Sequence, residues 1–199
     1  MDHFLQEASI RVPPLTTAGK LAFAYAICVR LQPHYQAFSH ATGWGNPVVM
    51  QAALDLLRRA IFLPPALADL RRSYRQVERV TPDSEDVGSP LGSLALDTCC
   101  AVLSAFDFVL GGNDQSVLDV ATFSRNTVDV YVQEIEELDP SDPELEAKID
   151  GHQYMVREVK WQREALDQLT GIDQPTPILL DKLIQGKMLD LDLLPEEKS

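Results

Sequence analysis

Cysteine is scarce in this sequence, and its positions exclude a disulfide framework. The 199 residues contain three cysteines, and two of them, Cys99 and Cys100, are adjacent, so they cannot bridge each other without strain. Cys28 and the adjacent pair all stand within apolar runs. An odd number of cysteines in apolar surroundings is typical of reduced core thiols. We therefore expect a cytoplasmic protein.

The motifs that commonly hold metals or activate nucleophiles are also missing. A di-iron bundle needs Glu-x-x-His pairs, but the residues three positions before His34, His40 and His152 are Leu, Ala and Ile. The sequence contains no His-Glu-x-x-His, Cys-x-x-Cys, Gly-x-Ser-x-Gly or glycine-rich phosphate loop. The sequence thus predicts no metal site and no cofactor, and it favours a role other than catalysis.

Long uncharged hydrophobic runs are absent as well. Acidic and basic residues interrupt the first eleven positions before any apolar run begins, so we expect no secretory leader. The longest apolar stretch, from Leu91 to Leu110, contains Asp97 and Asp107. Two uncompensated acids favour a buried helix over a membrane span.

The charge that is present is mainly negative and unevenly distributed. A formal net charge of −13 disfavours nucleic acid and anionic membranes as partners. Residues 1–75 hold 8 basic and 4 acidic side chains, whereas residues 76–199 hold 9 and 26. Such regions can be solvated faces, or they can be complementary patches that meet between subunits or on a partner protein.

Two segments concentrate these charges. Eight acidic residues and a single lysine lie between Glu134 and Asp150. Six arginines lie between positions 58 and 79, namely Arg58, Arg59, Arg71, Arg72, Arg75 and Arg79.

Capping residues, prolines and glycines divide the chain into helices. A small polar residue followed by proline, a pair typical of a helix start, occurs at Asn46-Pro47, Ser89-Pro90, Asp142-Pro143 and Thr176-Pro177. Glycines that favour helix ends stand at 43, 111–112, 171 and 186. The sequence therefore predicts eight helices, over about residues 17–32, 33–42, 47–62, 64–80, 90–110, 114–138, 143–170 and 177–185, with a polar loop at 81–88.

Apolar periodicity predicts how these helices pack. Residues spaced alternately four and three apart form one stripe in 114–138, through Ser124, and another in 143–170, through His152 and Val156. This is the seam geometry of antiparallel bundles. The helices at 17–32 and 90–110 lack a polar face, so we expect them at the centre of a single all-α domain over residues 1–199. Residues 187–199 form a C-terminal tail that alternates like a strand, and we expect it either to pack on the bundle edge or to act as a docking motif.

Three charged residues fall inside apolar segments. Asp97 interrupts Leu94–Leu103, Arg30 ends the apolar run of the first predicted helix, and Asp55 lies in Ala-Leu-Asp-Leu-Leu. A buried carboxylate needs a cationic or multiply donating partner, and Arg30 is the first candidate partner of Asp97. Such a pair either fixes helix packing or forms the floor of a polar pocket.

The segment from Pro33 to Pro47 is the most distinctive in the chain. It contains Tyr35, and it places Trp44 between two glycines, which leaves the backbone free on both sides of the indole. Either Trp44 closes a tight turn between helices, or it is an aromatic contact residue for a ligand.

These residues also carry a family resemblance. Cys28-x-Arg30-x-x-Pro33-x-Tyr35-x-x-Phe38-x-x-x-Thr42-Gly43-Trp44-Gly45, followed by Leu54-Asp55-Leu56 and by Leu96-Asp97-Thr98-Cys99, resembles the bacterial family called Domain of Unknown Function 416. The resemblance covers about residues 15–170. It implies an all-helical bacterial protein of this length, and it implies no activity.

Two functions remain open. The first is a non-enzymatic protein that binds another protein or itself through an acidic, partly apolar helical surface. The second is a small-molecule or enzymatic pocket formed by Arg30, Tyr35, Trp44, Asp55 and Asp97. The second requires these five side chains to converge on one cavity open to solvent.

Overall fold

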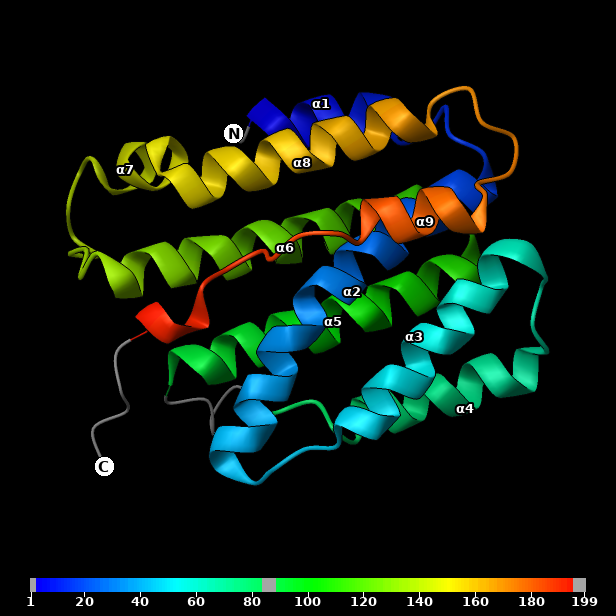
Figure 1. Cartoon of the computed structure of the whole chain (residues 1–199), viewed down its shortest axis with the longest axis horizontal. Coiled ribbons are helices and arrows are strands. Elements are labelled where there is room, and N and C mark those ends of the chain that lie inside the picture. Colours follow the sequence, from blue (N-terminus) through cyan, green and yellow to red (C-terminus); the bar gives the residue numbers. More distant parts are fainter. Residues whose placement is uncertain (1–2, 84–88, 195–199) are drawn as a thin grey trace.

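The computed structural model describes residues 3–83 and 89–194 of the chain. Within them the chain is all α-helical, with a short 3-10 helix at Leu191–Leu193 and no strand. The nine α-helices are α1 (His3–Arg11), α2 (Thr17–Thr42), α3 (Pro47–Phe62), α4 (Leu67–Glu78), α5 (Pro90–Gly111), α6 (Asp114–Ile135), α7 (Leu145–Gly151), α8 (Gln153–Leu169) and α9 (Pro177–Leu183). The predicted helical bundle is thereby confirmed (Figure 1).

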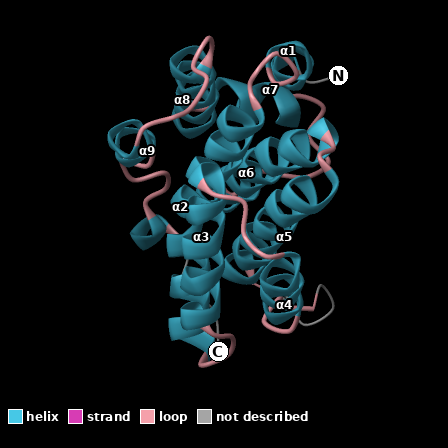
Figure 2. Ribbon diagram, turned by 90° about the vertical axis from the view of Figure 1, so that its right-hand side faces the viewer, coloured by secondary structure: helices cyan, strands magenta, loops and turns pink. Residues whose placement is uncertain are grey.

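The two helices without a polar face lie at the centre, as the sequence predicts. α2 packs against α3, α5, α6, α8 and α9, and α5 packs against α2, α3, α4 and α6. Residues 21–28 of α2 are buried without interruption. Figure 2 shows α2, α5 and α6 in the middle of the bundle, with α1, α8 and α9 on one side and α4 on another.

Among the described residues, α5 alone is long and apolar enough to cross a membrane by length and composition. Half of its most apolar window is buried inside the protein, where it contacts α2 and α6. A central bundle helix has the same composition, because it meets other helices on several faces.

Most helix ends follow the local signals in the sequence. Asn46, Ser89 and Thr176 each accept a hydrogen bond from a backbone N–H of the first helical turn. Gly43 and Gly112 end α2 and α5 in the left-handed conformation, which costs glycine little.

One helix stands where the sequence suggests two. Pro33 was expected to start a new helix, but α2 runs through it from Thr17 to Thr42. Proline removes one backbone hydrogen bond, yet Pro33 itself is exposed, whereas Gln32 and His34 on either side of it are buried. Burial of the flanking residues therefore favours continuation of the helix through Pro33.

The reverse correction applies to residues 143–170, where one helix was predicted and two are found. Gly151 ends α7, and His152 adopts an extended conformation and caps α8. This break rotates the buried stripe, so Val156 is exposed while Met155, Glu158 and Gln162 are buried. The predicted register of α8 is therefore wrong, whereas the stripe of α6 through Ser124 is buried as predicted.

The two ends of the chain also differ from expectation. α1 was not foreseen, although Phe4, Ala8 and Val12 recur every four residues and are buried. Of the predicted tail, residues 187–194 are described, and Met188 and Leu189 are buried against the bundle. The Tyr131 hydroxyl and the Arg157 guanidinium donate hydrogen bonds to the backbone of this segment. Of the loop expected at 81–88, residues 84–88 lie outside the described residues.

Candidate protein-binding groove

Arg30 lies in the core and pairs with a residue that the sequence did not single out. Its guanidinium donates a hydrogen bond of 2.8 Å to the carboxylate of Glu158 on α8, and the two residues are 7% and 2% exposed. Ser124 and Gln162 also donate to Glu158, and the Trp161 ring lies 3.9 Å from the guanidinium carbon. The pair joins α2 to α8, so the expected Arg30–Asp97 ion pair is wrong.

Asp97 instead lies in a cleft between α5 and α6. It accepts a hydrogen bond of 3.2 Å from the Thr127 hydroxyl, and it lines a hollow of about 340 Å³ together with Asp129 and Asn126. Burial raises the pKa of Asp97 to about 7, and the charge of Asp129 adds to this effect. Asp97 is thus a half-buried carboxyl that is held by a hydroxyl rather than by a base.

Tyr35 and Trp44 belong to one turn. The Tyr35 hydroxyl is buried, donates to the backbone oxygen of Val80 at 2.8 Å and accepts from the backbone N–H of Asn46 at 3.0 Å. Trp44 is 43% exposed and meets Phe38 edge-on. Tyr35 therefore fixes the turn between α2 and α3, while the Trp44 indole remains on the surface.

The five candidate residues lie in different parts of the described structure. Asp55 is exposed on α3 and accepts a hydrogen bond from the Gln51 side chain. Of the five, only Asp97 lines any of the described hollows. The structure places Arg30 and Tyr35 in the core, Trp44 and Asp55 on the surface, and Asp97 in the cleft beside α6.

Three further ionisable side chains, those of Cys28, Cys99 and His34, are buried. Burial raises the pKa of the Cys28 thiol and raises that of Cys99 to about 12, so both thiols stay protonated and unreactive near neutral pH. Burial and the Arg30 charge lower the pKa of His34 to about 3. Residues 3–83 and 89–194 contain no group of three or more His, Cys, Asp or Glu side chains placed to hold a metal.

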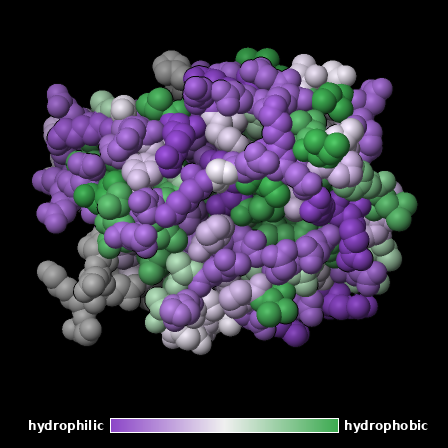
Figure 3. Space-filling view, viewed as in Figure 1, coloured by the Kyte–Doolittle hydropathy of each residue, from purple (hydrophilic) through white to green (hydrophobic). Residues whose placement is uncertain are grey.

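A different surface stands out on α3 and on the turn that follows it. Large apolar side chains are exposed at nine described positions, and five of them lie between residues 44 and 67, namely Trp44, Val48, Phe62, Leu63 and Leu67. On the face shown in Figure 3, hydrophobic side chains appear in separate patches among hydrophilic ones. A concentration of exposed apolar residues in one segment marks a contact surface more often than isolated ones do.

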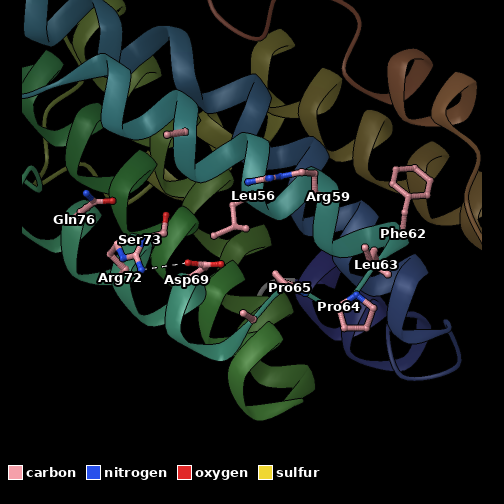
Figure 4. A pocket seen from close by; sticks show the side chains of 12 residues that line it. Leu56, Arg59, Phe62, Leu63, Pro64, Pro65, Asp69, Arg72, Ser73 and Gln76 are labelled. Carbon is pink, nitrogen blue, oxygen red and sulfur yellow. Dashed lines mark ion pairs between the residues drawn. The ribbon is translucent and has the colours of Figure 1, made fainter.

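Two of these residues, Phe62 and Leu63, line a groove between α3 and α4. Its volume is about 580 Å³, and its lining residues are Ala52, Leu56, Arg59, Phe62, Leu63, Pro64, Pro65, Ala66, Asp69, Arg72, Ser73 and Gln76. Leu56 of α3 faces Asp69 and Ser73 of α4, and the Pro64-Pro65 turn closes one end (Figure 4). The lining from Ala52 to Phe62 extends about 15 Å along α3, enough for about three turns of a docked helix.

The charges of the groove come from the arginine-rich segment of the sequence. Arg72 pairs with Asp69 at 3.4 Å, and Arg58 pairs with Asp181 of α9 at 2.7 Å. Arg59 is exposed and forms no ion pair or side-chain hydrogen bond with any described residue. The groove therefore combines an apolar floor with an unpaired guanidinium at its edge.

Sequence reasoning identified part of this site. The six arginines of residues 58–79 form a positive cluster in the sequence, whereas the helix predicted over residues 47–62 gives no indication that Phe62 and Leu63 are exposed. The signal that was available is the proline pair at 64–65: it ends α3, so the residues just before it lie at the bend instead of inside the bundle.

Comparisons with known proteins give the family and the fold. A family model described as "Protein of unknown function (DUF416)" matches residues 8–188. The "Uncharacterized protein YjaG" of Escherichia coli K12 is 23% identical over 120 residues, which are 60% of this chain and 61% of that protein. The match thus spans less than two thirds of that relative. The crystal structure of a DUF416 family protein from Shewanella baltica OS155 has a TM-score of 0.78 and 26% identity, and the match covers 92% of this chain and 91% of that one.

Proposed function

This chain belongs to the DUF416 family of proteins of unknown function, and from its own surface we propose that it is a non-enzymatic protein-interaction protein whose docking surface is the α3–α4 groove. The observation that carries the proposal is the unpaired Arg59 beside the exposed apolar residues Phe62 and Leu63. An apolar groove of three helical turns fits the apolar face of an amphipathic helix. A free guanidinium at its edge selects for a carboxylate beside that face.

The proposed surface has an unpaired positive charge, whereas the sequence suggested an acidic surface. The acidic segment of residues 134–150 is partly neutralised within the chain, because Asp142 pairs with Lys148 and Asp150 with Arg125. Its exposed side chains include no large apolar residue. Binding of a partner needs buried apolar area as well as charge, and the α3–α4 groove offers both.

The alternative is a small-molecule pocket shared by Arg30, Trp44 and Asp97. Their placement gives it no support, because Arg30 is buried with Glu158, Trp44 is on the surface, and Asp97 lies in a cleft with Asp129. We place the protein in the cytoplasm, since its three cysteines are free thiols and reduced thiols persist there.

A peptide-binding assay tests the proposed function. The probe is a fluorescein-labelled amphipathic peptide with leucines along one face and glutamates beside them, and the matched probe carries lysines in place of the glutamates. We expect the acidic peptide to bind the full chain more tightly. Arg59→Glu should weaken this binding at least about tenfold, or about 1.4 kcal/mol, whereas Lys160→Glu on the distant helix α8 should leave it unchanged. Equal binding of both peptides would refute the proposal.

A further inference from the structure

The outward face of α3 carries a repeating pattern that the bundle does not use. Val48, Ala52, Asp55, Arg59 and Phe62 are spaced alternately four and three residues apart, and all five are exposed. Residues at this spacing lie in one stripe along a helix. A stripe of this kind forms the seam where two antiparallel helices pack.

The stripe is complementary to itself when it is read in the opposite direction. If two copies of α3 lie antiparallel about a two-fold axis at the level of Leu57, Asp55 of each copy lies opposite Arg59 of the other. In the same register, Ala52 lies opposite Phe62. Each of these layers thus joins an acid to a base or a small side chain to a large one, and Val48 has no counterpart within the partner's α3. A two-fold interface requires this kind of self-complementarity, since the same patch serves both partners.

We propose that the occupant of the docking surface is a second copy of this chain, bound through an antiparallel contact between the two α3 helices. The inference rests on the proposed function, because it assigns a partner to the same groove. In this arrangement Asp55 of each copy contacts Arg59 of the other. Phe62 of each copy enters the other copy's groove beside Ala52.

The charges on α3 are available for this contact. Asp55 and Arg59 are one helical turn apart, a spacing at which an acid and a base often pair. In the described structure, however, Asp55 is bonded to the Gln51 side chain, and Arg59 has no partner. Arg58 differs from its neighbour, because it is already engaged by Asp181. The antiparallel register therefore brings together Arg59, which has no ion-pair partner in the described structure, and Asp55, which is bonded only to the Gln51 amide.

The apolar groups are also suited in size and exposure. Phe62 is 41% exposed, so a large part of its ring has no contact within the chain. The groove beside Ala52 has a volume of about 580 Å³, and an alanine at this layer leaves room for an aromatic ring. Burial of both Phe62 rings would supply the apolar area that a pair of surface ion pairs alone does not provide.

A charge-swap experiment tests this arrangement on the full chain. By sedimentation velocity at low salt and roughly 1–100 µM protein, we expect a monomer–dimer equilibrium. Asp55→Arg places like charges opposite each other, and so does Arg59→Asp, so each variant alone should weaken dimerisation at least about tenfold. An equimolar mixture of the two variants restores both opposite-charge pairs in a heterodimer and should regain dimerisation, as should the double variant D55R/R59D.

The controls separate this proposal from the function on which it rests. Lys160→Glu should leave the dimer unchanged, and circular dichroism checks that each surface variant remains folded. A chain that is monomeric throughout, or a mixture that fails to re-associate, would overturn the α3–α3 contact. If that monomer still binds the acidic peptide in an Arg59-dependent manner, the docking function stands and its occupant is another protein. If it does not bind the peptide, both proposals fail.

Discussion

Arg30 and Glu158 form a buried ion pair across 128 positions of sequence, with the guanidinium donating to the carboxylate at 2.8 Å. The pair connects the central helix α2 to the outer helix α8. Removing one member of such a pair leaves an unpaired charge in a medium that solvates it poorly. The first prediction follows from this geometry.

Glu158→Ala should lower the free energy of unfolding by about 3–5 kcal/mol, because it leaves Arg30 buried without a counter-charge. Urea denaturation measures this. The double variant R30M/E158L replaces the pair by apolar side chains of similar size and should recover part of the loss, because Ser124 and Gln162 still lose their acceptor. A loss below about 1 kcal/mol in the single variant would show that the pair contributes little.

Asp97 should make stability depend on pH. Its pKa is about 7 in the folded protein, mainly because of burial, against about 3.9 in an unfolded chain. Between these values the folded state binds more protons than the unfolded state, so stability falls as pH rises from about 4 to 7. Asp97→Asn removes this loss and keeps an acceptor for Thr127.

At pH 8 the Asp97→Asn variant should therefore be more stable than the parent by about 1–3 kcal/mol, after allowance for partial exposure of the carboxyl. The difference should shrink toward pH 4. Urea denaturation of both proteins at pH 5 and pH 8 checks this. A difference that is equal at the two pH values would contradict the assignment to Asp97.

Two glycines that flank Trp44 provide a matched comparison. Both have positive φ, +69° at Gly43 and +88° at Gly45, so alanine at either position costs about 1–2 kcal/mol. A Cβ at Gly45 would also lie 2.6 Å from the Tyr35 oxygen, whereas a Cβ at Gly43 would meet nothing within 4 Å.

Gly45→Ala should therefore lower the thermal midpoint more than Gly43→Ala does, because Tyr35 is held by two hydrogen bonds and cannot easily move away. In a Tyr35→Phe background the extra penalty at Gly45 should decrease, since the clashing oxygen is gone. Scanning calorimetry of the four variants would reveal this coupling, and equal penalties at the two glycines would rule it out.

Pro33→Ala should stabilise the protein. Alanine supplies the backbone N–H that proline lacks in the interior of α2, and no packing is lost because Pro33 is exposed. The gain should be about 1–3 kcal/mol, seen as a higher urea midpoint. A lower midpoint would mean that the proline shapes the helix in a way that the fold requires.

Local signals in the sequence predict the architecture well, because they act over a few residues. Asn46 and Ser89 cap helices because the first backbone N–H groups of a helix need acceptors. α2 and α5 lack a polar face because they are buried on several sides. Both signals can be read within the segment itself. The expectation at Pro33 is wrong because Gln32 and His34 on either side of it are buried in the bundle, and this burial outweighs the local penalty of the proline. The local sequence pattern contains no information about that burial.

The site could be predicted only in part. Glu158 looks like a surface acid until the break at His152 sets the rotation of α8, and that rotation depends on how α7 packs. The sequence offers Arg30 as the partner of Asp97, whereas Arg30 pairs with Glu158, because the choice of partner depends on helix positions in space. The groove was missed because its floor comes from two helices that meet only after folding.

α1 is tied to a helix that lies far along the chain, α8. Arg11 of α1 pairs with Asp167 of α8, and Glu7 accepts a hydrogen bond of 2.8 Å from Arg163, so these contacts span 156 residues. Until the ribosome has released that distant segment, α1 can pack against α6 but lacks its ion pairs to α8. Contacts of such long range slow assembly, and the ion pairs between α1 and α8 cannot all form until the chain has been made as far as Asp167.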